Sequence, residues 1–126
     1  PYENLVLPFL ILRSLWKARN LLKEFKPDIV IGTGGYASAA MMQIAVWAKV
    51  PTLIHESNGY AGLANKLLAS NVSKICVSYP NMKRFFPENK LVLTGNPIRK
   101  DLVNLDSIKE AAYKHFDLDQ TKKTLF

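Results

Sequence analysis

Apolar residues recur at helical spacing in the first part of the chain. They stand at Leu12, Leu15, Trp16 and Leu22. This pattern, with polar residues on the other faces, predicts a helix from about Phe9 to Phe25. Lys26-Pro27 ends the helix, because proline disfavours a helical conformation in the residue before it.

Short apolar runs and longer runs without proline alternate through the rest of the chain. The short runs predict buried strands at residues 28–31, 52–55, 74–78 and 91–94. The longer runs predict helices at residues 37–49, 61–70 and 107–116, with one helical turn at 81–86 and Asp106 or Ser107 as the last N-cap. Strands that alternate with helices predict an α/β fold with a Rossmann-like, doubly wound parallel sheet.

Polar or glycine-rich clusters follow three of the predicted strands. They are Gly32–Tyr36, His55–Asn58 and Gly95–Arg99. The carboxyl ends of parallel strands meet at one edge of a sheet, where ligands bind in such folds. The sequence therefore predicts a ligand site that these clusters share.

The first cluster reads Gly32-Thr33-Gly34-Gly35-Tyr36, between a strand and a helix. Glycine permits positive φ and a close approach of the backbone, and a helix N-terminus offers free N–H groups to an anion. These properties favour a phosphate or pyrophosphate cradle. The loop is neither a Walker loop nor a full G-x-G-x-x-G fingerprint, so a tight strand-to-helix turn is the alternative interpretation.

The second cluster, His55-Glu56-Ser57-Asn58, offers an imidazole, a carboxylate and an amide at one strand end. Such groups position a hydroxyl-rich ligand, and His55 and Glu56 are candidates for acid–base work. Alternatively, these two residues bond each other or cap the following helix. Gly59 stands where H-E-x-x-H needs its second histidine, which argues against a zinc protease.

Asn65 and Arg99 are two further candidates for the ligand site, each judged by itself. Asn65 lies one turn into the next predicted helix, either on the side of the site or as an exposed or capping amide. Arg99 carries a guanidinium that suits phosphate or carboxylate, although an isolated arginine is more often solvated.

The segment from Leu5 to Leu12 is apolar and carries a basic fringe, which includes Arg13, Lys17 and Arg19. One interpretation is a helix packed on the sheet. The other is a patch that lies on an anionic membrane surface, with Leu12 and Trp16 in the interface and Arg13 and Lys17 on head groups. The run is too short to cross a bilayer, which needs roughly 20 apolar residues.

The composition limits the function further. The chain has 126 residues and a formal net charge of +7, which favours anionic partners. The single cysteine, Cys76, excludes an internal disulfide and a cysteine metal cluster, and we expect it to be buried and inert. The chain begins at Pro1 rather than methionine, so we expect a fragment. Basic and aromatic residues are not interleaved as in nucleic-acid binding modules; a continuous basic stripe would be needed for that function.

The motifs taken together resemble the MurG family of peptidoglycan glycosyltransferases. The similarity rests on KPDIVIGTGGYAS, PTLIHESNGYAGLANKLLA and LTGNPIR, which occur in this order. That family transfers N-acetylglucosamine from UDP-N-acetylglucosamine to lipid I, the undecaprenyl-pyrophosphoryl muramyl pentapeptide, and so makes lipid II. The resemblance implies that residues 1–126 are part of the N-terminal, acceptor-side domain of a GT-B enzyme, with the donor-binding domain mostly beyond Phe126.

The resemblance also implies roles for particular residues. The acceptor's pyrophosphate would be held by Gly34, Gly35 and Tyr36, with Asn65 on the same side. The donor would be bound by Asn58 and Arg99. His55 and Glu56 match cleft residues with less settled roles, and the general base would be a histidine in a glycine loop before Pro1.

The family attaches to the cytoplasmic face of the membrane through an apolar patch with a basic rim, and Leu12, Arg13, Trp16 and Lys17 fall in the matching stretch. It implies no metal and no cofactor. Ser57 departs from the family, which usually has glutamine there, and Thr33 stands where other members vary. The alternative function is a non-catalytic Rossmann module that binds a nucleotide or phosphorylated ligand.

Overall fold

The computed structural model describes residues 3–100 and 106–123. They belong to two compact units, Pro1–Asn96 and Pro97–Phe126, each of which is considered by itself. The first unit holds the sheet and most of the helices.

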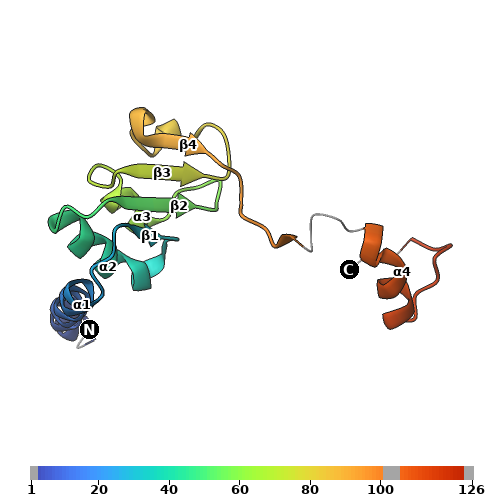
Figure 1. Cartoon of the computed structure of the whole chain (residues 1–126), viewed down its shortest axis with the longest axis horizontal. Helices are drawn as coiled ribbons and strands as arrows, with labels where there is room; N and C mark the ends of the chain where they lie inside the picture. The colour runs from blue at the N-terminus through green and yellow to red at the C-terminus, as the bar shows by residue number, and fades with distance from the viewer. Residues whose placement is uncertain (1–2, 101–105, 124–126) are drawn as a thin grey trace. The chain divides into compact units, whose positions relative to one another are not determined.

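Four parallel strands form the sheet of the first unit (Figure 1). They are β1 (Val30–Gly32), β2 (Thr52–Glu56), β3 (Lys74–Val77) and β4 (Leu91–Leu93), and they pair in the order β1-β2-β3-β4. Gly32 is opposite Ile54, and Val77 is opposite both Glu56 and Leu93. The predicted parallel sheet is confirmed, with strand boundaries within two residues of the prediction.

Helices precede and connect the strands. They are α1 (Glu3–Phe25), α2 (Gly35–Trp47) and α3 (Leu63–Leu68), with 3₁₀ turns η1 (Met82–Arg84) and η2 (Glu88–Lys90) before β4. The predicted start of α1 at Phe9 is wrong, because the helix continues through Pro8. Pro8 lies inside α1, where proline removes one backbone donor and its ring crowds the carbonyl group four residues earlier, yet the helix is not interrupted.

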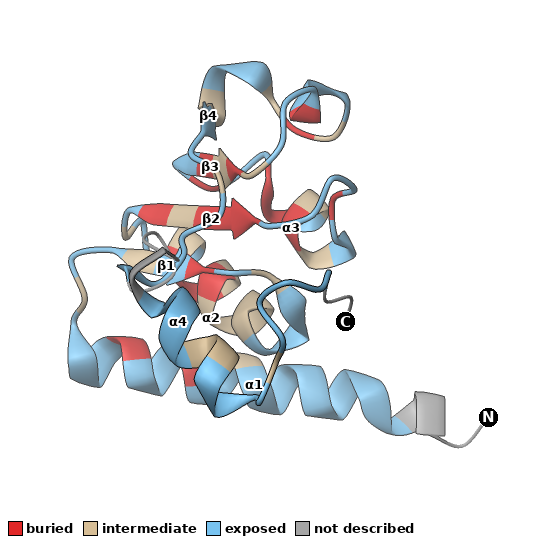
Figure 2. Ribbon diagram, turned by 90° about the vertical axis from the view of Figure 1, so that its right-hand side faces the viewer, coloured by how far each residue is buried: buried red, intermediate tan, exposed pale blue. Residues whose placement is uncertain are grey.

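The core of the first unit lies between the sheet and the helices that cover it (Figure 2). Met42 of α2 and the strand residues Ile54 and Ile75 are almost completely buried. Met82 and Phe86 close the core beside β3 and β4. Cys76 of β3 is only partly buried, so the expectation of a fully buried thiol is wrong.

Helix α1 packs on α2 and not chiefly on the sheet (Figure 1). Ala18 and Leu22 are buried against Ile44 and Ala45 of α2. The rest of α1 is largely exposed in the first unit, as Figure 2 shows. The interpretation of this segment as a helix packed directly on the sheet therefore needs correction: one narrow face packs on a neighbouring helix.

The second unit contains α4 (Asp106–His115), close to the predicted 107–116. Leu118 donates its backbone N–H to Tyr113 after the helix ends. Asp119 accepts hydrogen bonds from the N–H and the hydroxyl of Thr121. The side chains of the predicted N-cap residues Asp106 and Ser107 lie outside the described residues.

Candidate functional site

A pocket of about 240 Å³ opens at the carboxyl ends of β1 and β2. The start of α2, the loop after β2 and the start of α3 form its walls. Its lining residues are Thr33, Gly34, Gly35, Tyr36, Glu56, Ser57, Asn58, Gly62, Leu63, Ala64 and Asn65. The structure thus brings together six of the predicted site residues: Gly34, Gly35, Tyr36, Glu56, Asn58 and Asn65.

The glycine loop adopts a backbone that side chains rarely permit. Gly34 is the N-cap of α2 with φ 88° and ψ −170°, and Gly35 has φ 74°. A Cβ on Gly34 would lie 3.2 Å from Nδ2 of Asn65. Gly34 is therefore required both by its conformation and by the close approach of Asn65. The loop leads directly into the N-terminus of α2, whose first N–H groups favour an anion.

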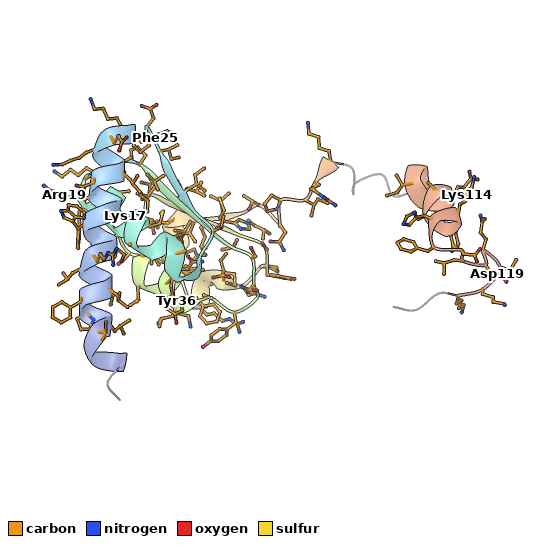
Figure 3. The ribbon with its side chains drawn as sticks, turned by 90° about the horizontal axis from the view of Figure 1, so that it is seen from below. Lys17, Arg19, Phe25, Tyr36, Lys114 and Asp119 are labelled. Carbon is orange, nitrogen blue, oxygen red and sulfur yellow. The ribbon has the colours of Figure 1, made fainter. Side chains whose placement is uncertain are left out.

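Tyr36 lies at the rim of the pocket, in the first turn of α2 (Figure 3). Its side chain is 86% exposed, so it is not part of the core. Tyr36 therefore borders the pocket with a side chain that is open to solvent.

Glu56 is the centre of a hydrogen-bond network beneath the pocket. Its Oε1 accepts from the backbone N–H and from Nδ2 of Asn58, at 3.0 and 2.9 Å. Its Oε2 accepts from the N–H of Gly62 and from Nδ2 of Asn65, both at 2.9 Å. Only 2% of Glu56 is exposed. The carboxylate thus fixes the turn that precedes α3 and the side chains of two other candidates.

The same contacts determine the charge of Glu56. Burial by itself raises the pKa of this carboxyl group, but the hydrogen bonds from Gly62, Asn65 and Asn58 together outweigh burial and hold the pKa below its ordinary value of 4.5. Glu56 is consequently ionised at neutral pH. Both of its oxygens already accept two hydrogen bonds, so the geometry suits positioning better than proton transfer.

Asn65 is 3% exposed and packs below the glycine loop. Its Nδ2 donates to Glu56 and, at 3.4 Å, to the carbonyl oxygen of His55. Among the described residues, its Oδ1 is a buried side-chain oxygen without a hydrogen-bond partner. Asn65 therefore connects the loop after β1 with the end of β2.

His55 is the residue before Glu56 in β2, and its ring does not line the pocket. The ring lies 9% exposed on the side toward β3 and β4, where Nε2 is 3.1 Å from the carbonyl oxygen of Gly95. Nδ1 is 3.3 Å from the hydroxyl of Ser57. The predicted bond between His55 and Glu56 is not among the contacts that the two side chains make.

Arg99 belongs to the second unit, while Gly95 and Asn96 belong to the first. The structure therefore does not place the arginine relative to the pocket. Its assignment to the donor stays a prediction.

The predicted membrane residues Leu12, Arg13, Trp16 and Lys17 all lie on exposed parts of α1. Leu12 is 64% and Trp16 65% exposed. Figure 3 shows Lys17 and Arg19 on this helix, with Phe25 at its end. In the part of the chain that the structure describes, no helix has the length and apolar character to cross a bilayer.

A larger groove of about 670 Å³ lies elsewhere, between the end of α1 and β1. Its lining is mostly apolar and includes Leu21, Phe25, Ile29 and Ile31. None of the predicted site residues borders it. Within residues 3–100 and 106–123, no group of three or more His, Cys, Asp or Glu side chains could hold a metal ion.

Comparison with protein families decides the classification. Residues 2–77 match the glycosyltransferase family 28 N-terminal domain. The chain belongs to glycosyltransferase family 28. The match covers α1 to β3 and therefore includes the whole pocket.

Several curated relatives of this family 28 chain share one name, UDP-N-acetylglucosamine–N-acetylmuramyl-(pentapeptide) pyrophosphoryl-undecaprenol N-acetylglucosamine transferase. The relative from Flavobacterium psychrophilum is 46% identical over 98% of this chain, which covers 34% of the relative. The relative from Parabacteroides distasonis is 52% identical over 90% of this chain and 31% of its own length. The chain thus spans about a third of the curated relatives it matches.

A solved structure agrees with these relatives. The crystal structure of Acinetobacter baumannii MurG matches with a TM-score of 0.64 and 36% identity, over 72% of this chain and 26% of that one. The resemblance to the MurG family and the Rossmann-like fold of its N-terminal domain are thereby confirmed.

Several residues that line the family 28 pocket were not predicted from the sequence. Gly62 supplies a backbone N–H to Glu56, and Leu63 and Ala64 form part of the wall. The signal for Gly62 was weak, because a glycine just before a helix is common. Its importance comes from the path of the loop 57–62, which brings its N–H back to the end of β2.

Proposed function

We propose that this chain is part of a MurG-type enzyme that transfers N-acetylglucosamine from UDP-N-acetylglucosamine to lipid I and makes lipid II. One observation carries the proposal: a pocket at the carboxyl edge of the sheet joins a glycine loop at a helix N-terminus to a fixed cluster of amides. The family and the names of the relatives support the substrate assignment.

The glycine loop suits the diphosphate of the acceptor. Gly34 and Gly35 carry no side chain above the first N–H groups of α2, and Tyr36 stands at the rim. A diphosphate accepts hydrogen bonds from such N–H groups and is stabilised by the helix dipole. A side chain at either glycine would also strain the backbone, since both have positive φ.

The amide of Asn58 suits a sugar nucleotide. Its Nδ2 is held by Glu56, which leaves the carbonyl oxygen of the amide to accept a hydroxyl or N–H of a sugar. Arg99 would contribute positive charge to the same donor, and a guanidinium fits a diphosphate by paired hydrogen bonds. We assign both residues to donor binding.

The reaction we propose is an inverting displacement. The 4-hydroxyl oxygen of the muramyl residue attacks the anomeric carbon of N-acetylglucosamine, and the bond from that carbon to UDP breaks. A base takes the hydroxyl proton, and the leaving diphosphate carries the electron pair. Positive charge or helix N-termini stabilise that growing charge. Glu56 positions Asn58 and Asn65, and the base is supplied by a part of the enzyme outside this chain.

We also propose that α1 holds the enzyme on the inner face of the cytoplasmic membrane. The exposed apolar residues Leu12 and Trp16 are next to Arg13 and Lys17. Apolar side chains enter the interface while cations contact anionic head groups. Because lipid I is anchored in that membrane, a surface-bound enzyme meets its acceptor directly.

The test is an assay of the full-length enzyme with radiolabelled UDP-N-acetylglucosamine and a short-chain lipid I analogue. We expect the label in the lipid product and UDP in equal amount. Arg99→Ala should raise the donor KM or lower kcat by about tenfold or more, because a charge-assisted contact is lost. Lys100→Ala is the matched control, since it removes the neighbouring exposed charge.

One result would contradict the transfer reaction, and another would contradict only the role of Arg99. Wild-type enzyme that binds UDP-N-acetylglucosamine but transfers nothing would favour a non-catalytic binding module. Equal kinetics of Arg99→Ala and the wild type would remove Arg99 from the donor site while leaving the transfer reaction standing.

A further inference from the structure

The ring of His55 has no task in the proposed reaction, although it is 9% exposed and surrounded by polar groups. It lies at the end of β2, next to the ends of β3 and β4. Four residues around it form a connected chain of hydrogen bonds: Ser57, Ser78, Gly95 and Asn96.

The partners of His55 fix which ring nitrogen carries the proton. Nε2 is 3.1 Å from the carbonyl oxygen of Gly95, which can only accept, so Nε2 must be the donor. Nδ1 of the neutral ring then has a lone pair, and it accepts from the hydroxyl of Ser57 at 3.3 Å. The neutral Nε2–H tautomer satisfies both contacts.

Ser78, directly after β3, completes the network. Its hydroxyl donates to Oδ1 of Asn96 at 2.5 Å. The oxygen of Ser78 is therefore left as an acceptor, 3.5 Å from Nε2 of His55. The ring N–H and the two serine hydroxyls of this network each have an acceptor, and the contacts join the ends of three strands.

The network ends where the first unit ends. Gly95 has φ 72° and donates its N–H to Val77 of β3, so the chain turns sharply after β4. Asn96 is the last residue of the first unit, and Pro97 begins the second, which contains Arg99. His55 thus contacts Gly95 and Ser78 contacts Asn96, so both residues of the turn are bound to the carboxyl ends of β2 and β3.

We propose that His55 is a positioning residue that fixes the Gly95–Asn96 turn, and with it the point from which the segment to Arg99 departs. This inference rests on the proposed function only for its kinetic consequence. His55 acts through the turn and not as a proton carrier, because Nε2–H is directed at a backbone carbonyl and Nδ1 at a serine hydroxyl. Ser57 lines the pocket, so it links the ring to the site.

Two substitutions in the full-length enzyme separate positioning from proton transfer. The amide nitrogen of His55→Gln reaches about as far as Nε2 and can still donate to Gly95, whereas His55→Asn reaches only as far as Nδ1. We expect His55→Gln to keep at least about a third of wild-type kcat/KM, and His55→Asn to raise the donor KM about tenfold with a smaller change in kcat.

The pH dependence of kcat/KM separates positioning from proton transfer, and the rise in donor KM without a matching fall in kcat separates positioning from a general loss of folding. Under the proposal, His55→Gln keeps both limbs of the wild-type profile. If His55 transfers the proton, His55→Gln is as inactive as His55→Asn and one limb disappears. Either of these results overturns the proposal.

A spectroscopic measurement is independent of activity. Histidine-selective ¹⁵N labelling of the full-length enzyme, with the signal assigned by its loss in His55→Gln, reports the protonated ring nitrogen. We expect the Nε2–H tautomer, and a ring protonated on Nδ1 alone contradicts the proposal. If wild-type enzyme transfers no sugar while this tautomer is found, the proposed function fails and the positioning of the turn stands.

Discussion

The pocket and the exposed side of α1 both depart from the usual rule that polar side chains are exposed and apolar side chains are buried. The pocket buries polar groups, and α1 exposes apolar ones. At the pocket, Glu56 and Asn65 are almost completely buried, while on α1 large apolar residues such as Phe9 and Trp16 are 73% and 65% exposed. Buried charge and exposed apolar surface are both costly for a folded protein unless they are compensated. The two regions differ in where the compensation is found.

At the pocket, the cost of the buried charge is offset by hydrogen bonds from nearby residues of the same chain. Four hydrogen bonds reach Glu56 from residues that are two to nine positions away in sequence, so this part of the chain itself supplies the partners of the buried charge. On α1, a narrow face that includes Ala18 and Leu22 packs on α2, whereas Phe9 and Trp16 lie outside that face and remain exposed in the described part of the chain. This difference fits the proposed function, in which a reaction site needs fixed geometry and a membrane contact needs only apolar area and charge.

The largest effect should come from removing the centre of the pocket network. Glu56→Ala leaves the donors of Asn58, Gly62 and Asn65 without their acceptor in a buried place. We expect the free energy of unfolding to fall by about 3–5 kcal/mol. Urea denaturation followed by far-UV circular dichroism measures the loss.

Glu56→Gln is the matched control, because it keeps the shape and removes the charge. Since folding lowers the pKa of Glu56, its contribution to stability is complete above the ordinary value of 4.5 and is lost as the pH falls through the lower pKa of the folded state. Glu56→Gln should therefore lose less stability than the wild type as the solution is acidified from pH 7. The same pH dependence in both proteins would contradict this assignment.

An intermediate effect is expected at the glycine loop. Gly34→Ala forces a Cβ into a conformation with φ 88° and to within 3.2 Å of Asn65. We expect a loss of about 1–3 kcal/mol, together with weaker binding of a diphosphate ligand in isothermal calorimetry. Gly59→Ala is the control, because its φ is ordinary and its nearest neighbour, a ring carbon of Tyr79, is 4.0 Å away. Equal stability of the two variants would show that the loop tolerates side chains.

The smallest effect on folding should come from α1. Trp16→Glu should change stability by no more than about 0.5 kcal/mol, because Trp16 is 65% exposed. The same substitution should weaken binding to vesicles of phosphatidylglycerol and phosphatidylethanolamine by about tenfold, since apolar contact is lost and a negative charge is added. Sedimentation with vesicles measures it.

Asn20→Glu is the control for Trp16→Glu, because it adds the same charge at an exposed polar position of the same helix. Equal vesicle binding of the two variants would contradict a specific contact at Trp16. Early melting of Trp16→Glu would instead identify a packing role for the tryptophan.

The fold could be predicted from the sequence because short apolar runs alternate with longer helical runs. Apolar runs near Val30, Ile54 and Ile75 correctly gave parallel strands, and the polar residues after β1 and β2 met in one pocket as expected. The start of α1 could not be predicted from the sequence, because proline is unfavourable in a helix interior and α1 nevertheless continues through Pro8.

The roles within the site were harder to predict than its location. Glu56 and His55 are adjacent in sequence and both can transfer protons. The side chain of Glu56 nevertheless lies under the pocket, and that of His55 lies toward β3 and β4. Successive side chains of a strand point to opposite faces of the sheet, which explains why the two side chains separate. Their hydrogen-bond partners depend on the loop that leads to Gly62 and on the turn at Gly95. Three-dimensional structure was needed to find them.

The unpaired edge of β1 has a consequence for the solubility of this chain. Among the described strands β1 pairs only with β2, and Ile31 is 61% exposed beside the apolar groove of α1. An uncovered strand edge next to apolar side chains is a template for self-association. Preparations of the chain should therefore lose solubility steeply with concentration, and a charged substitution at Ile31 is the first remedy to try.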